Sequence, residues 1–130
     1  MKPIGTDRVE AQTVARLWPV SQVSSKLEIL PKYAKGLKDI RAGQHIEVVF
    51  VFHKSPAFTD DLNIQYPPHH KQPRGVFSIC SPVRPNPIGL SILEVIAVHQ
   101  TVIEVCGVDM LDTTPILDIK PHIPLAAEKS

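Results

Sequence analysis

The sequence predicts an all-β or β-dominated fold, a single small β-barrel with long loops and at most one short helix. Hydrophobic residues make up 43% of the 130-residue chain and aromatic residues only 5%, so the apolar content is mainly aliphatic and rich in strand-favouring β-branched types. The 13 prolines are about twice the usual frequency of roughly 5%. Because helix interiors do not tolerate proline, a large helical content is excluded. The length suits one domain, residues 1–130.

The first strand prediction falls on residues 26–30. Leu27 and Ile29 alternate there with charged residues, which is typical of a strand with one buried face. Residues 31–37 follow, and Pro31 suits the first turn of a short helix. This is the one helix that the sequence predicts.

Further strands are predicted from apolar runs in the second half of the chain. Residues 46–52 are almost continuously apolar, which favours a central strand covered on both faces. Residues 54–74 lose all periodicity and hold four prolines, so they predict a long loop. Residues 75–79 predict a short strand, and residues 91–98 and 101–106 predict two strands joined by a hairpin.

The bulk numbers exclude several classes of protein. The net charge of +1 gives no overall basic field. No apolar stretch approaches the roughly 20 residues of a membrane span, and no apolar leader opens the chain, so no membrane partner and a cytoplasmic location are expected. Cys80 and Cys106 form neither a C-x-x-C pair nor a disulfide framework.

Two cofactor classes also lack their motifs. The six glycines never form G-x-G, so a dinucleotide-type phosphate loop is absent. His69 and His70 are adjacent, but adjacent histidines rarely chelate one ion and no cysteine or carboxylate is close in sequence. We therefore expect no metal site.

The most unusual stretch is the strap, which we define as residues 81–90. Three residues in it precede prolines and are pushed toward extended backbone, so the strap cannot be a helix or pair as a central strand. Its carbonyls should be available as acceptors, Arg84 offers a planar fork for a carboxylate or phosphate, and Gly89 is expected to let the chain turn sharply into the next strand. The alternative is a crossing loop with a structural role only.

A second polar cluster spans residues 109–121. Asp109, Asp112 and Asp118 lie within ten residues, and such carboxylates can accept a proton or hold amine groups. The alternative interpretation is a turn at residues 112–113 that leads into an edge strand.

These segments together resemble the TsaA-like domain, the core of the tRNA (N6-threonylcarbamoyladenosine) methyltransferase O family. The resemblance rests on Gly75-Val76-Phe77, on the string Arg84-Pro85-Asn86-Pro87-Ile88-Gly89-Leu90-Ser91, and on Leu117-Asp118-Ile119-Lys120-Pro121 after Thr114-Pro115. It covers nearly the whole chain, with the core at residues 3–124, and implies a β-barrel that acts as a homodimer. The longer C-terminal region that helps to hold tRNA in such proteins has no counterpart here.

The resemblance also implies S-adenosyl-L-methionine as the cofactor, bound near the subunit interface. The positions that would contact it are His53, Lys54, Cys80, Arg84, Leu90, Asp112, Thr113, Thr114 and Pro115. The family usually has arginine in place of Cys80 and glycine in place of Thr113. The contact at Cys80 would then be lost, move to Arg84 or be made by backbone. Candidate proton acceptors, which the sequence does not rank, are Asp112, Asp118 and His53.

The expected function is therefore cofactor-dependent methylation at N6 of threonylcarbamoyladenosine next to the anticodon of tRNA. Two alternatives remain open at this point. One is the same chemistry on a smaller acceptor, which the absent C-terminal region favours. The other is a dimeric barrel without enzymatic activity that binds S-adenosyl-L-methionine.

Overall fold

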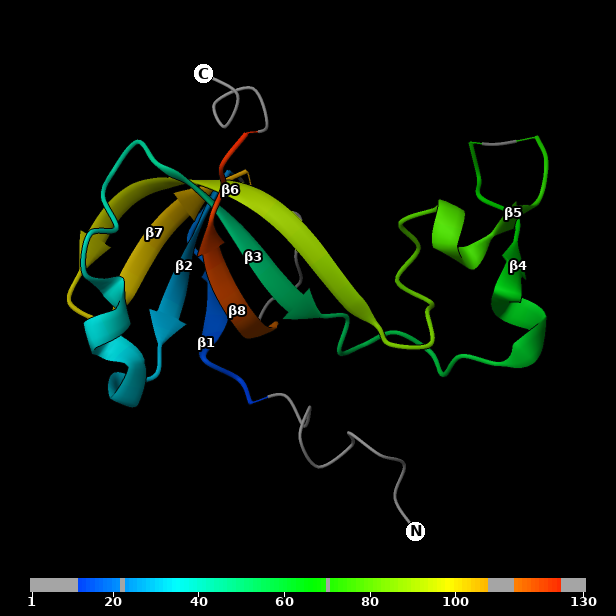
Figure 1. Cartoon of the computed structure of the whole chain (residues 1–130), viewed down its shortest axis with the longest axis horizontal. Helices are drawn as coiled ribbons and strands as arrows, with labels where there is room; N and C mark the ends of the chain where they lie inside the picture. The colour runs from blue at the N-terminus through cyan, green and yellow to red at the C-terminus, as the bar shows by residue number, and fades with distance from the viewer. Residues whose placement is uncertain (1–11, 22, 70, 108–113, 125–130) are drawn as a thin grey trace, which may run out of the picture.

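The computed structural model describes residues 12–21, 23–69, 71–107 and 114–124. Six of its strands close into an antiparallel barrel in the order β1-β2-β7-β6-β3-β8 (Figure 1). These strands are β1 (Ala15–Pro19), β2 (Ser24–Ile29), β3 (His45–Val51), β6 (Ile88–His99), β7 (Val102–Cys106) and β8 (Pro115–Pro121). The prediction of a small, strand-dominated barrel is confirmed.

The barrel interior is filled by side chains that alternate along the strands. In β2, Leu27 and Ile29 are buried while Lys26 and Glu28 are exposed, as their alternation predicts. The buried cluster is almost entirely aliphatic and consists of Ala15, Leu17, Leu27, Ile29, Ile46, Val48, Phe50, Leu93, Val95, Ile103, Val105 and Ile116. Closure pairs both edges of every barrel strand, so the barrel leaves no edge open.

Strand β3 is central, but the prediction that both its faces are covered is wrong. It pairs with β6 on one side and β8 on the other, and Ile46 and Val48 point into the core. The alternate residues Val49 and Val51 are only half-buried, since no helix or second sheet among the described residues covers them. Val49 and Val51 pair across the ladder with Leu90 and Ile88 of β6, which are also apolar.

Residues 60–78 form an arm that projects from the barrel (Figure 1). Its elements are η2 (Asp60–Asn63), β4 (Ile64–Gln65), β5 (Arg74–Gly75) and η3 (Val76–Ser78), and β4 and β5 make a separate two-stranded sheet. The predicted strand over residues 75–79 is therefore wrong beyond Gly75. Val76 is 2% exposed at the start of the turn η3, so local packing overrides its strand preference.

Two other segments differ from expectation in instructive ways. The predicted short helix is present as a 3-10 helix, η1 (Pro31–Leu37). Strand β8 is not an edge strand, because it pairs with both β1 and β3 to close the barrel.

No helix in the described part of the chain is long and apolar enough to cross a membrane.

Candidate functional site

The first part of the strap, residues 81–87, forms no helix or strand and leads from the arm into β6. Residues 88–90 already belong to β6 and pair with β3, so the prediction of an unpaired strap is wrong there. Because prolines remove ladder donors, its carbonyls are left to other partners. Three groups outside the strap donate to them: Ser55 Oγ to Pro82 O at 3.0 Å, Gln65 Nε2 to Val83 O at 2.8 Å and the Phe52 amide to Pro87 O at 2.7 Å. The strap is thus tied to both arm and barrel, and these three carbonyls accept hydrogen bonds from the protein itself instead of being left available.

Arg84 braces the chain just before the strap. It is half-buried, and its Nη1 donates to Ile79 O at 2.7 Å and to Ser81 O at 3.3 Å. These two carbonyls flank Cys80, so the guanidinium holds the backbone on either side of that residue. Both bonds leave from one nitrogen, whereas a guanidinium carries five N–H groups in a planar fork.

Gly89 does not make the sharp turn expected of it, and that prediction is wrong. It lies inside β6, paired with Phe50 across the ladder. A Cβ at this position would meet the Phe50 ring and would lie 2.8 Å from Phe52 Cζ. Phe50 and Phe52 pack edge to face with centroids 5.0 Å apart, so glycine is required by close packing.

Three residues singled out by the sequence meet in one hollow beside the strap. We call this the strap hollow; its volume is about 480 Å³. Its lining combines the two phenylalanine rings with the start of β6, and consists of Phe50, Phe52, Ile79, Cys80, Arg84, Ile88, Gly89, Leu90 and Ser91. The structure therefore brings Cys80, Arg84 and Leu90 together.

The other predicted site residues have different positions. His53 and Lys54 are exposed in the turn after β3, and the His53 amide donates to Val51 O at 2.9 Å. Thr114 is 2% exposed where β8 begins, and Pro115 is the first residue of that strand. These residues lie at the barrel end where β3 ends and β6 begins, because Phe50 pairs with both Gly89 and Ile116.

The candidate proton acceptors do not gather at the strap hollow. Asp118 lies on the outer surface of β8, 3.8 Å from Lys120 Nζ, and lines a small hollow beneath η1. Asp112 and Thr113 fall outside the described residues. His53 remains the candidate that the structure describes at the same barrel end as the strap.

A second hollow, which we call the arm hollow, adjoins the strap hollow. It has a volume of about 560 Å³ and shares Ile79 and Cys80 with the strap hollow as lining residues. The remaining wall comes from the arm and the strap: Gln65, Tyr66, Pro67, Pro68, His69, Ser78, Ser81 and Pro82. Cys80 thus lies between the two hollows.

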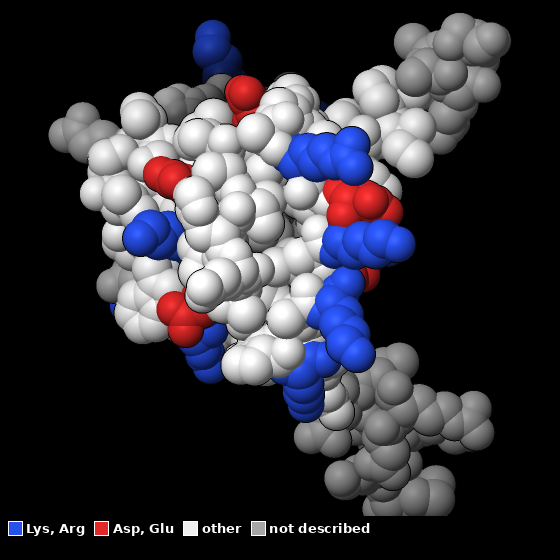
Figure 2. Space-filling model, turned by 90° about the vertical axis from the view of Figure 1, so that its left-hand side faces the viewer, with Lys and Arg blue, Asp and Glu red and all other residues white. Residues whose placement is uncertain are grey.

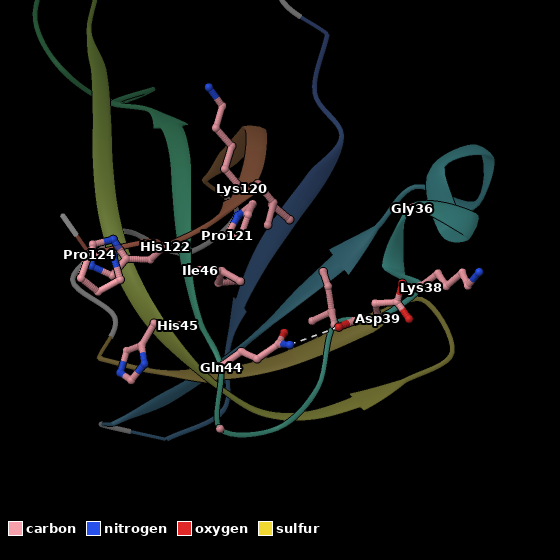
Figure 3. Close-up of a pocket in the computed structure, with 13 residues that line it drawn as sticks. Gly36, Lys38, Asp39, Gln44, His45, Ile46, Lys120, Pro121, His122 and Pro124 are labelled. Atoms are coloured by element: carbon pink, nitrogen blue, oxygen red, sulfur yellow. Dashed lines mark hydrogen bonds between the residues drawn. The ribbon is translucent and has the colours of Figure 1, made fainter. Parts of the chain in front are cut away.

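A third hollow lies beside η1, at the start of β3 and the end of β8, and sequence reasoning missed it. Figure 3 shows its lining, where the Gln44 amide donates to Asp39 O at 3.2 Å. The volume is about 650 Å³, and His45, Lys120 and His122 line it. His122 Nδ1 is 3.0 Å from Glu47 Oε2 on β3. The long-range pairing of β3 with β8 brings these segments together, so no local sequence pattern predicts the hollow.

Among the described residues, no group of histidine, cysteine and acidic side chains is arranged to hold a metal ion.

Residues 12–127 match the family described as the tRNA-methyltransferase O N-terminal domain. An S-adenosyl-L-methionine-binding protein of Archaeoglobus fulgidus is 37% identical over 127 residues, which cover 95% of this chain and 89% of the relative. A tRNA (adenine(37)-N6)-methyltransferase of Mus musculus is 43% identical over 79 residues, 61% of this chain and 18% of that enzyme.

The crystal structure of TrmO from P. aeruginosa superposes with a TM-score of 0.67 at 25% identity, covering 89% of this chain and 55% of that one. The chain spans only 54% and 27% of the length of two other archaeal relatives. The match to the family extends through the barrel, the arm and the strap. The chain belongs to the tRNA-methyltransferase O N-terminal domain family.

Proposed function

We propose that this protein is an S-adenosyl-L-methionine-dependent methyltransferase whose acceptor is N6 of threonylcarbamoyladenosine next to the anticodon of tRNA, a reaction of the cytoplasm. The observation that carries the proposal is the strap hollow, which gathers Cys80, Arg84 and Leu90 at one barrel end. The relatives support it through their names, since one binds S-adenosyl-L-methionine and another methylates N6 of adenine 37 in tRNA.

The strap hollow suits the cofactor in size and chemistry. Its volume of about 480 Å³ lies within the 300–1,000 Å³ usual for small-ligand sites. The rings of Phe50 and Phe52 offer an apolar wall, and Arg84 offers charged donors to a carboxylate. When bound, the cofactor supplies a methyl group on a positively charged sulfur.

The protein's contribution to this chemistry is positioning. Holding two reactants in an attack geometry is worth up to about 7–11 kcal/mol in favourable cases. The carbonyl bonds of the strap and the Arg84 brace fix the backbone around Cys80, where the strap and arm hollows meet. The acceptor nitrogen must also lose a proton. Of the candidate acceptors, His53 lies at this barrel end, Asp118 does not line the strap hollow, and Asp112 falls outside the described residues.

The function is tested by transfer of labelled methyl groups from S-adenosyl-L-methionine to total tRNA, followed by nucleoside analysis. We expect label in N6-methylated threonylcarbamoyladenosine. We also expect the cofactor alone to stabilise the protein, by about 2.7 kcal/mol at 100 times its dissociation constant. Transfer to a small acceptor but not to tRNA would refute the substrate, and the absence of both a thermal shift and a calorimetric signal at millimolar cofactor would refute the cofactor.

We also propose that the protein is a two-fold symmetric homodimer, the commonest closed assembly of soluble proteins. The supporting feature is the outer face of β6, where four large aliphatic side chains are exposed: Ile88, Leu90, Ile92 and Ile96. Leu90 alone is 60% exposed. Ile88 and Leu90 also line the strap hollow, so burial of this stripe against a second copy would bring the cofactor site next to the subunit interface.

Replacing Ile92 and Ile96 with glutamate should convert the dimer to a monomer, because two charges would then be buried without partners. Sedimentation velocity at tens of micromolar protein gives the readout. Val23→Glu is the control, since Val23 is an exposed aliphatic residue that lies before β2, away from the stripe. A wild-type protein that sediments as a monomer, or a double variant that stays dimeric, would contradict this assignment.

A further inference from the structure

The sequence around η1 repeats with a period of three. Ala34, Leu37 and Ile40 are half-buried, and Leu37 and Ile40 pack against the barrel core. Lys32, Lys35 and Lys38 recur two residues before each of these and are all exposed. A 3-10 helix has three residues per turn, so side chains three apart lie above one another at a rise of about 6 Å. Within η1 the repeat places Ala34 and Leu37 on one edge and Lys32 and Lys35 on another, and Lys38 and Ile40 continue the same spacing just after the helix ends.

We call these three lysines the η1 basic ridge. Figure 2 shows the side of the molecule that carries η1, where several Lys and Arg side chains follow one edge, with an acidic patch between two of them. This edge contrasts with the chain as a whole, whose net charge is only +1. The cationic charge is therefore local, and it is concentrated on a face of the barrel where an extended anion can approach.

The contacts among the described residues leave the positive charge of the ridge lysines available to an external anion. Ion pairs among the described residues join Arg41 with Asp39, Lys120 with Asp118, and His122 with Glu47, and none involves a ridge lysine. Lys32 Nζ lies 5.1 Å from the centre of the Tyr33 ring, a contact that keeps its charge. The Asp39 carboxylate, the acid nearest in sequence, is 3.8 Å from Arg41 Nη2.

Helix stabilisation does not explain the ridge. Cations favour the last turn of a helix and are unfavourable in the first, where acids are preferred. Lys35 satisfies this rule, but Lys32 lies in the first turn, which holds no acidic residue. A helix that needed only solubility or dipole compensation would have no reason for this arrangement.

The hollow of Figure 3 continues the same surface. Lys38 belongs both to the ridge and to the lining of that hollow, whose other ionisable residues include His45, Lys120 and His122. Asp39 is the one acidic residue that lines it. The ridge and the hollow thus form a continuous surface rich in nitrogen donors.

We infer that the η1 basic ridge binds the sugar–phosphate backbone of the acceptor RNA. This inference rests on the proposed function, which supplies an RNA as the acceptor, and adds a docking surface distinct from the strap and arm hollows. Lysines contact phosphates as point charges without reading sequence, so the ridge would position the RNA while the hollows select the nucleoside. Displacement of counterions makes such binding steeply dependent on salt.

The test compares two double variants of equal charge. Lys35→Gln/Lys38→Gln removes two ridge charges, and Lys26→Gln/Lys71→Gln removes two exposed charges from β2 and from the arm. Binding of an in vitro transcribed tRNA is measured by fluorescence anisotropy from low to high salt. The ridge variant should lose roughly 1.4–1.8 from the slope of log affinity against log salt, and roughly tenfold in affinity near 0.15 M salt, while the control should match wild type.

Two further measurements separate the ridge inference from the proposed function. They are methyl transfer at saturating tRNA and cofactor binding by calorimetry. The ridge variant should keep both, with a raised KM for tRNA. Equal losses in both double variants would show that overall charge, not the ridge, attracts the RNA, and would overturn the inference. Unchanged binding by the ridge variant, with methyl transfer intact in wild type, would overturn the ridge alone. A wild-type protein that neither binds nor methylates tRNA would overturn both.

Discussion

Gly89→Ala should lower the free energy of unfolding by about 1–3 kcal/mol, the usual cost of overpacking a tightly filled core. The new methyl group would overlap the Phe50 ring and approach Phe52 Cζ to 2.8 Å. Phe50 is buried in the barrel and cannot swing outward without leaving a cavity behind it. Urea denaturation monitored by circular dichroism gives the energy directly.

The same chain supplies a matched control. Gly75→Ala adds the same methyl group at a position with no atom within 4 Å, and its backbone has an ordinary negative φ of −65°. It should leave stability unchanged or raise it slightly, since alanine restricts the unfolded chain. Equal effects at both positions would mean that the Phe50 and Phe52 rings do not require glycine. Because both rings line the strap hollow, Gly89→Ala should also weaken cofactor binding, whereas Gly75→Ala should not.

The barrel could be predicted because its strands carry a local signal. In β2, Leu27 and Ile29 alternate with charged residues, and this alternation alone predicts which face of the strand is buried. Strand β1 was not predicted, since its five residues include an outward Trp18 and end in proline. The assignment of β8 as an edge strand failed for a related reason. Closure depends on pairing between β1 and β8, which lie about a hundred residues apart.

In the candidate site too, some features could be predicted from local sequence and others could not. The strap was found because its prolines constrain the backbone locally and its string of residues is distinctive, and the acceptor role of its carbonyls followed. Gly89 was misjudged because a glycine required by a turn and one required by a neighbouring ring look alike in sequence. The hollow beside η1 depends on the pairing of β3 with β8, so His45 and His122 gave no signal before the fold was known.

Arg84→Ala should reduce cofactor binding or methyl transfer at least tenfold. Hydrogen bonds from a charged donor contribute roughly 1.5–3 kcal/mol, and about 1.4 kcal/mol corresponds to one decade in affinity. Arg84→Lys should fall between wild type and Ala, because lysine keeps the charge but loses the planar fork. Calorimetry with S-adenosyl-L-methionine and single-turnover kinetics on tRNA measure the two quantities.

The proposed anion-binding role of Arg84 must be separated from a bracing role, since its Nη1 donates to Ile79 O and Ser81 O. Gln65 provides the control, because its Nε2 braces the strap at Val83 O without carrying a charge. If Arg84 binds the cofactor carboxylate, Gln65→Ala should cost much less cofactor affinity than Arg84→Ala, and the lysine variant should recover part of the loss. If bracing is its whole contribution, the two alanine variants should lose similar cofactor affinity and lysine should bring no recovery. Unfolding by urea completes the comparison. Water can replace the lost donor at these partly exposed carbonyls, so Arg84→Ala should cost less than about 1 kcal/mol of stability. A larger loss would identify Arg84 as a structural ion and remove it from the cofactor site.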